Sequence, residues 1–224
     1  MIMETKTQKI KCAVFDLDGT LLNTLKTINY YLNFALNKNG LGSICEEDCR
    51  AFVGDGAVKL ILRALNRLNA DESKFDSVFA DYNEAYNSNP YYLTEPYNGV
   101  CPMLRELKDS GIKLAVLSNK PDFATKAAIE HFFPNVFDLA FGAREGVRLK
   151  PDPDALLSML CEIGVDKEYT AYIGDSEPDV FTAKNADVAL SVSVLWGFRS
   201  KDQLRVAGAS IFATEPSDVI KYIM

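Results

Sequence analysis

The stretch Val14-Phe15-Asp16-Leu17-Asp18-Gly19-Thr20 decides most of what this sequence predicts. An apolar run over residues 10–15 is typical of a buried strand. It leads into two aspartates spaced i, i+2, and the glycine after them lets the chain turn so that both carboxylates face one cleft. Ligands of open α/β sheets bind at this edge of a strand. Because two adjacent carboxylates repel each other, the pair predicts a hard divalent cation with oxygen ligands, above all Mg²⁺.

Three further polar segments follow, two at the ends of expected strands and one at the start of an expected helix. In chain order they are Ser118-Asn119-Lys120, Lys150-Pro151-Asp152-Pro153 and Gly174-Asp175-Ser176, the last followed by Asp179. Turn and helix-cap roles are common for aspartate, serine and asparagine, so one such segment alone would be weak evidence for a site. All four segments in this order favour one shared site.

These four segments resemble the motifs of the haloacid dehalogenase superfamily of phosphohydrolases. The resemblance covers nearly the whole chain and is closest to the branch that contains phosphoglycolate phosphatases and related phosphatases of small substrates. Further segments similar to that branch are Pro96-Tyr97-Asn98-Gly99-Val100, Leu117-Ser118-Asn119-Lys120-Pro121 and Trp196-Gly197-Phe198-Arg199. Asn23 departs from the branch, where an aspartate is common at this position. The resemblance implies a Rossmann-like core with a helical cap inserted after the first motif.

The resemblance also implies roles for individual residues. Asp16 attacks phosphorus and binds Mg²⁺, Asp18 protonates the leaving group and then deprotonates the attacking water, and Lys150 screens Asp16 from the phosphate. The implied phosphate-binding residues are Asp16, Thr20, Ser118, Asn119 (through its backbone amide) and Lys150, and the implied metal ligands are Asp16, Asp18 (through its backbone carbonyl), Asp175 and Asp179. Dehalogenase and phosphonate-cleaving relatives lack an acid at the position of Asp18, so its presence favours a phosphatase or a phosphomutase.

Two apolar patterns divide the chain. Between about residues 24 and 89 the spacing is helical throughout, and beyond about residue 97 strands alternate with helices. The alternation predicts an α/β fold with a mostly parallel sheet covered on both faces, and the earlier pattern predicts an all-helical insert. We expect a catalytic core of residues 1–22 and 93–224 and a cap domain of residues 23–92. The two connections between them are candidate hinges.

Local signals predict several element boundaries. After the first strand, strands are expected at residues 112–117, 137–141, 171–173, 188–192 and 211–213. Ser43-Ile44-Cys45-Glu46 fits a capping box. Pro121 and Pro153 are expected at the first position of their helices, where proline is favourable.

Composition narrows the class of protein. The 224 residues are 48% hydrophobic, which is enough for a good core, and the net charge of −7 argues against nucleic-acid or membrane-surface partners. No apolar stretch approaches the roughly 18 residues of a membrane span, and residues 1–11 lack the apolar core of a signal peptide. Five scattered cysteines fit reduced thiols. We therefore expect a cytoplasmic, monomeric protein whose partner is a small phosphorylated metabolite.

Several alternatives stay open at this point. Phosphoglycolate is the first candidate substrate, and a pyrophosphatase would carry the same core motifs. A β-phosphoglucomutase would need a cap that holds a bis-phosphorylated sugar; no lysine–arginine group of the insert is clearly spaced for that, but Arg50, Lys59 and Arg63 keep it open. A non-catalytic binding protein on this fold is the remote alternative. The only histidine, His131, lacks a nearby acidic strand-end partner, which leaves carboxylate chemistry as the favoured mechanism.

A few residues could belong either to the site or to ordinary structure. Gly54-Asp55-Gly56 fits a turn between helices or a loop that faces the site, and Arg199 fits a surface loop or the rim of the site. The aromatic residues of the insert are expected mostly in its core, with Tyr91 or Tyr92 as candidates for the border of the cleft.

Overall fold

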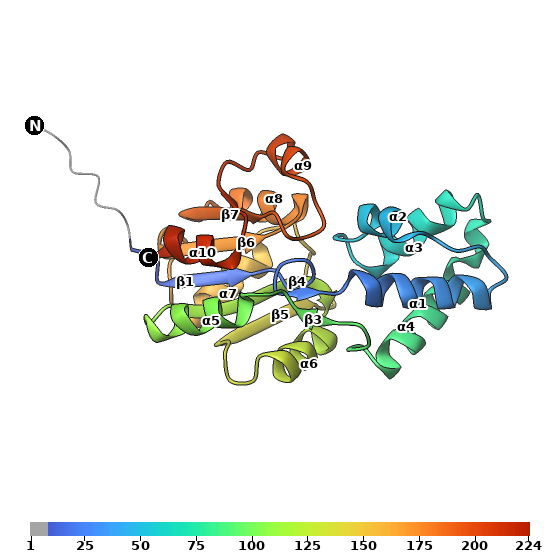
Figure 1. The fold of residues 1–224 in the computed structure, drawn as a ribbon, viewed down its shortest axis with the longest axis horizontal. Coiled ribbons are helices and arrows are strands. Elements are labelled where there is room, and N and C mark those ends of the chain that lie inside the picture. The colour runs from blue at the N-terminus through green and yellow to red at the C-terminus, as the bar shows by residue number, and fades with distance from the viewer. Residues whose placement is uncertain (1–8) are drawn as a thin grey trace, which may run out of the picture.

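The computed structural model describes residues 9–224, and Figure 1 shows how they are arranged. Six parallel strands form one sheet in the order β5-β4-β1-β6-β7-β8. The strands are β1 (Cys12–Phe15), β4 (Lys113–Pro121), β5 (Leu139–Ala143), β6 (Thr170–Gly174), β7 (Leu190–Val194) and β8 (Phe212–Ala213). The predicted α/β class with a parallel sheet is confirmed.

Strand β1 lies at the centre of the sheet, and all four of its residues are buried. Its side chains alternate between two apolar clusters, with Ala13 and Phe15 on one face and Cys12 and Val14 on the other. Both faces of the sheet are covered, which explains why the central strands are continuously apolar. The covering helices are α5 (Val100–Asp109), α6 (Asp122–Phe132) and α10 (Pro216–Ile223) on the first face, and α7 (Asp154–Ile163) and α8 (Glu177–Ala186) on the second.

Two shorter elements complete the core. Helix α9 (Lys201–Val206) packs through Leu204 against Val180 of α8, and a 3₁₀ turn, η2 (Lys167–Tyr169), leads into β6. No helix within residues 9–224 combines the length and the apolar character needed to cross a membrane.

The inserted segment forms a helical bundle beside the carboxyl-terminal edge of the sheet (Figure 1). We call α1 to α4 the cap helices; they are α1 (Leu25–Lys38), α2 (Glu46–Phe52), α3 (Ala57–Arg67) and α4 (Phe75–Ser88), with a 3₁₀ turn, η1 (Glu72–Lys74), before α4. Their apolar stripes meet in a cluster of their own, centred on residues such as Leu32, Ile61 and Val78. Two short strands, β2 (Leu22–Asn23) and β3 (Glu95–Pro96), pair antiparallel where the bundle joins the core.

The structure corrects several predicted boundaries. Strands β5 and β7 begin two residues later than predicted, at Leu139 and Leu190. Pro121 is the last residue of β4 and caps α6, so it is not the first helical residue. Pro153 likewise caps α7, which begins at Asp154. A proline has no N–H to donate, so it fits the cap position as well as the first turn, and its presence alone does not separate the two.

The capping box predicted at Ser43 is also wrong. Cys45 caps α2, and its sulfur accepts a hydrogen bond from the backbone N–H of Asp48 at 3.4 Å. The Ser43 hydroxyl instead contacts the side chain of Asn37. Glu46 is therefore the first residue of the helix, whereas a capping box from Ser43 would need it as the third.

Candidate active site

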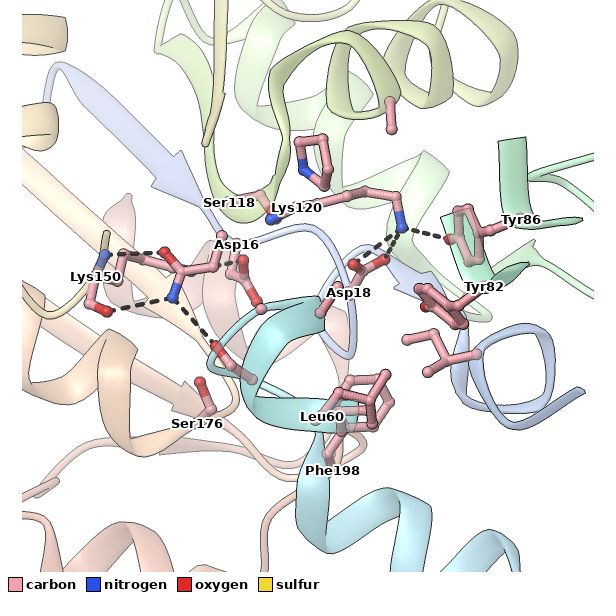
Figure 2. Close-up of a pocket in the computed structure, with 18 of the residues that line it drawn as sticks. Asp16, Asp18, Leu60, Tyr82, Tyr86, Ser118, Lys120, Lys150, Ser176 and Phe198 are labelled. Carbon is pink, nitrogen blue, oxygen red and sulfur yellow. Dashed lines mark hydrogen bonds and ion pairs between the residues drawn. The ribbon is translucent and has the colours of Figure 1, made fainter. Parts of the chain in front are cut away.

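The carboxyl ends of three neighbouring strands bring the predicted motifs together. Asp16 follows β1 directly, Ser118 lies on β4, and Asp175 follows β6. Because β4 and β6 both pair with β1, their ends meet at one edge of the sheet. Asp16, Ser118 and Asp175 line one cavity, which Figure 2 shows from close by.

The turn after Asp16 depends on Gly19. Its φ of 90° lies in the left-handed region, and a Cβ at this position would collide with the carboxylate of Asp175. The Gly19 N–H donates to the carbonyl of Leu22 at 2.9 Å, which closes the turn. Asp18 consequently lines the same cavity as Asp16.

Lys150 joins two of the acids. Its ammonium lies 2.7 Å from Asp16 Oδ1 and 2.7 Å from Asp179 Oδ1, and it also donates to the carbonyl of Leu117. Burial alone would lower the pKa of Lys150, but Asp16 and Asp179 outweigh it and hold that pKa well above its usual range. Lys150 is therefore a fixed positive charge beside Asp16 (Figure 2).

Asp179 is held by the start of α8. Its Oδ2 accepts hydrogen bonds from the backbone N–H of Ser176 at 3.0 Å and from the Ser176 hydroxyl at 2.6 Å, as part of a capping box. Tyr172 donates to its other oxygen at 3.1 Å. A Cβ at Gly174 would collide with the Asp179 side chain, so glycine is needed where β6 ends.

Three buried carboxylates form a candidate metal site. Ligand oxygens of Asp16, Asp175 and Asp179 lie within 4.8 Å of one another. Burial raises the pKa of Asp16 well above its usual range, against the opposing effect of Lys150. Burial and the Asp179 carboxylate raise the pKa of Asp175 to about 7. Three acids thus face a single ammonium, and this surplus of buried negative charge on oxygen donors fits a hard divalent cation.

The predicted phosphate-binding residues differ in what their side chains contact. Ser118 lines the cavity, and its hydroxyl accepts the N–H of Lys120 at 3.2 Å. The Asn119 side chain is committed to the backbone: its oxygen accepts the N–H of Lys150 at 2.9 Å, and its amide donates to the carbonyls of Gly54 and Lys150. The side chain of Asn119 therefore braces the loops around the site.

The hydroxyl of Thr20, a predicted phosphate-binding residue, contacts a predicted metal ligand. Thr20 is buried, it lies outside the residues that line the cavity, and its hydroxyl donates to Asp175 Oδ1 at 3.1 Å. The backbone N–H of Phe198 donates to the other oxygen of Asp175 at 2.7 Å. Thr20 thus orients a predicted metal ligand.

The cap helices and the loops between them supply the opposite wall of the cavity. The lining residues from this side are Ile28, Val53, Gly54, Gly56, Ala57, Leu60, Tyr82, Asn83, Tyr86 and Asn87. Gly54 and Gly56 therefore face the site, whereas Tyr82 and Tyr86, rather than Tyr91 and Tyr92, border the cleft. Within residues 9–224 this wall contributes no charged side chain.

Two residues after β7, Phe198 and Arg199, connect the core with the cap helices. Arg199 is buried, and its guanidinium donates to the carbonyls of Arg50 and Val53, each at 2.7 Å, and to Glu177 at 2.8 Å. Phe198, a residue of the core, packs into the apolar cluster of the cap helices. Both residues lie in the loop after β7, in the segment Trp196-Gly197-Phe198-Arg199 whose resemblance to the phosphatase branch was the available signal.

Lys120 also connects the core with the cap helices. Its ammonium contacts both carboxylate oxygens of Asp18, at 3.1 and 3.2 Å, and the hydroxyl of Tyr86 at 2.5 Å. The available signal was its position directly after Ser118-Asn119, at the same strand end. The predicted cap cations Arg50, Lys59 and Arg63 do not line the cavity; Lys59 and Arg63 pair with Asp55, and Arg50 with Glu46.

Comparison with known proteins agrees with this geometry. Residues 13–192 match the family model of haloacid dehalogenase-like hydrolases. The chain is 31% identical over 210 residues to a phosphoglycolate phosphatase of Rhodospirillum rubrum, covering 90% of this chain and 86% of that protein. It is 28% identical to a phosphoglycolate phosphatase of Aquifex aeolicus, covering 95% and 96% of the two chains.

Solved structures show the same relationship. A crystal structure from Lactobacillus delbrueckii subsp. bulgaricus, whose name gives phosphoglycolate phosphatase as its inferred activity, matches with a TM-score of 0.93 and 31% identity over 96% of this chain and 99% of that chain. The resemblance inferred from the four motifs is confirmed. The chain belongs to the haloacid dehalogenase-like hydrolase family and is an enzyme of that family, a phosphoric monoester hydrolase similar to its phosphoglycolate phosphatases.

Proposed function

We propose that this protein is a Mg²⁺-dependent phosphatase that hydrolyses a small phosphate monoester through an aspartyl-phosphate on Asp16, with phosphoglycolate as its substrate. One observation carries the proposal: Asp16 lies in a cavity between the Lys150 ammonium, 2.7 Å away, and two further buried carboxylates, with Asp18 two residues on. The relatives named phosphoglycolate phosphatase support the choice of substrate.

In the first step a carboxylate oxygen of Asp16 attacks phosphorus and the bond from phosphorus to the ester oxygen breaks. Asp18, in its acid form, gives its proton to the departing oxygen, so the leaving group departs as a neutral alcohol. In the second step water attacks phosphorus, Asp18 takes the proton of that water, and the bond to Asp16 breaks. Inorganic phosphate is released and both aspartates return to their starting forms.

The cation would be held by the carboxylates of Asp16 and Asp175 and by the backbone carbonyl of Asp18. Asp179 would hold it directly or through water. A bound Mg²⁺ neutralises part of the charge on Asp16 and on the phosphoryl oxygens, which lets one anion approach another. Lys150 contributes the second positive charge on that path.

In this proposal the phosphoryl oxygens meet donors from the end of β4. We assign this role to the Ser118 hydroxyl and to the backbone N–H of Asn119, because the Asn119 side chain is already committed to Gly54 and Lys150. For Thr20 we propose that its hydroxyl orients Asp175 instead of binding the phosphate.

The cap wall bears on the alternatives. A mutase that holds a bis-phosphorylated sugar needs cations for the second phosphate, and Arg50, Lys59 and Arg63 lie outside the cavity lining. Pyrophosphate and phosphoglycolate each carry a second anionic group, so the uncharged wall does not separate these two; the names of the relatives favour phosphoglycolate. We also propose that residues 23–92 form a cap domain that moves about β2 and β3, because these short strands are its links to the core.

The test measures phosphate release from a panel by the purified protein with Mg²⁺ and again with EDTA. The panel contains phosphoglycolate, 2-hydroxyethyl phosphate (its analogue without the carboxylate), pyrophosphate, β-glucose 1-phosphate and p-nitrophenyl phosphate. We expect phosphoglycolate to be hydrolysed fastest and EDTA to stop every reaction. Release that persists in EDTA, or none from any compound, would overturn the proposed chemistry; a higher rate with another compound would overturn the substrate alone.

A further inference from the structure

Lys120 is a buried cation that the proposed reaction does not use. Its side chain is 8% exposed, and it lies at the end of β4, on the opposite side of Asp16 from Lys150 (Figure 2). An ammonium has three N–H donors, and Lys120 has three acceptors in reach: Oδ1 and Oδ2 of Asp18 and the hydroxyl of Tyr86. Its hydrogen-bonding capacity is therefore filled without a substrate.

The charge of Lys120 is held in place by these same partners. Burial alone would lower the pKa of Lys120, but the Asp18 carboxylate and Tyr86 outweigh it, so that pKa is raised. A buried ammonium is costly unless it is paired and hydrogen-bonded, so it stays against Asp18. The contact to both carboxylate oxygens fixes the rotation of the Asp18 side chain as well as its position.

The third partner comes from the cap. Tyr86 lies on α4, is buried, and carries its hydroxyl 2.5 Å from the Lys120 ammonium, whereas Asp18 and Lys120 both belong to the core. The ammonium also lies 4.8 Å from the centre of the Tyr86 ring. The contact between Lys120 and Tyr86 thus exists only while the cap helices lie against the core.

We propose that Lys120 is a positioning residue that orients Asp18 for its proton transfers, holding one carboxylate oxygen while the other carries the proton, and that Tyr86 fixes Lys120 when the cap is closed. The inference rests on the proposed function, because it assumes that Asp18 is the acid of that reaction. Lys120 does not contact the reacting atoms in this account; it acts through Asp18.

The experiment compares substrates whose leaving groups differ in whether they need a proton to depart. An alkoxide leaves only with a proton from Asp18, whereas p-nitrophenolate is a stable anion and leaves without one. For Lys120→Met we expect kcat/KM on phosphoglycolate and on 2-hydroxyethyl phosphate to fall roughly 10²-fold, the cost of a misplaced catalytic group. On p-nitrophenyl phosphate we expect kcat/KM to change less than about threefold, since it reports the steps up to phosphorylation of Asp16.

Two further variants separate positioning from packing. Lys120→Arg keeps the charge and can bind both oxygens of Asp18, so it should restore part of the loss on alkyl phosphates. Tyr86→Phe removes one hydrogen bond and should lower kcat/KM on alkyl phosphates by roughly tenfold or less. Combined with Lys120→Met, it should add no further loss, because Tyr86 acts through Lys120. Lys126→Met and Tyr222→Phe, at exposed positions, are the matched controls.

The outcomes that overturn the inference are distinct. Equal losses on alkyl and p-nitrophenyl phosphates would assign Lys120 to general packing. A loss on phosphoglycolate without one on 2-hydroxyethyl phosphate would make it a ligand of the substrate carboxylate. Unchanged rates would leave it without a role in the reaction. If the wild type released phosphate from no compound, the proposed function itself would fail, which differs from all three.

Discussion

The two walls of the cavity are lined by different kinds of side chain. The core wall carries Asp16, Asp18, Lys150 and Asp175, all ionisable and all hydrogen-bonded to other groups of the core. The cap wall carries apolar side chains, two tyrosines and two asparagines, and within the described residues no charge. The core wall thus has what phosphoryl transfer requires, whereas the cap wall can only shape the space for the rest of the substrate.

This difference teaches where chemistry and selectivity reside in the molecule. Charged groups in a buried space need fixed partners, and the ends of parallel strands supply them from a rigid sheet. Shape can come from helices that pack on a separate apolar cluster and reach the core through two short links. Changes to the nucleophile and to the predicted metal ligands of the core wall should therefore reduce the rate on every substrate, and changes to the cap wall should reduce some rates more than others.

The largest expected effect follows from replacing the nucleophile. For Asp16→Asn we expect kcat to fall by roughly 10⁴-fold or more on every substrate, because an amide cannot form the acyl phosphate. Phosphate release and the thermal melting curve are the measurements, and Asp187→Asn, an exposed acid, is the control. An Asp16→Asn protein with near wild-type turnover would disprove the mechanism.

Next comes the metal site, where activity and stability should move in opposite directions. Asp175→Asn should lower kcat/KM roughly 10²-fold or more by weakening the cation. In EDTA the same variant should melt at a higher temperature than the wild type, because burial and Asp179 disfavour the ionised carboxylate that the amide replaces. One kcal/mol is roughly 2–4 °C in Tm for a chain of this size.

Addition of Mg²⁺ supplies the second half of that test. It should raise the Tm of the wild type and of Asp202→Asn, a control at an exposed acid, but not that of Asp175→Asn. A wild-type Tm that does not respond to Mg²⁺ would contradict the assignment of the three carboxylates as a metal site.

The core wall could be predicted from the sequence because its geometry follows from the sheet. Asp16, Ser118 and Asp175 each stand at the end of an apolar run, and parallel pairing of those runs brings the ends together without further information. Even there, the hydroxyl of Thr20 binds Asp175, and a residue type alone does not reveal which neighbour it will meet.

The cap wall could not be predicted in the same way. The helical stripes identify α1, α3 and α4, but which residues face the site depends on how the bundle is set against the core. That placement is fixed by contacts such as Arg199 with the carbonyl of Val53 and Asn119 with the carbonyl of Gly54, which join residues far apart in the chain. Backbone carbonyls carry no sequence signal, so Tyr86 could not be distinguished in advance from Tyr91.

A smaller effect should follow from loosening the cap. Arg199→Met removes two charge-assisted hydrogen bonds to backbone carbonyls of the cap side, at Arg50 and Val53. Loss of these bonds favours the open form, so we expect kcat/KM to fall roughly tenfold on all substrates as the closed form becomes less populated. Arg205→Met, at an exposed site, is the control. A lower Tm with unchanged kcat/KM would mean that Arg199 stabilises the fold without governing closure.

The smallest effect should come from a change in the cap wall, which should alter only the selectivity between substrates. Asn83 lies on α4 and lines the cavity without a charge, so Asn83→Leu alters the shape and polarity of that wall and leaves the core acids in place. We expect the ratio of kcat/KM for phosphoglycolate over p-nitrophenyl phosphate to change by less than about tenfold, the scale of one polar contact. The Mg²⁺-dependent rise in Tm should match the wild type, as should both properties in Asn66→Leu, an exposed site on α3. Equal losses on both substrates would show that the cap wall contributes to the chemistry, and the division between the two walls would fail.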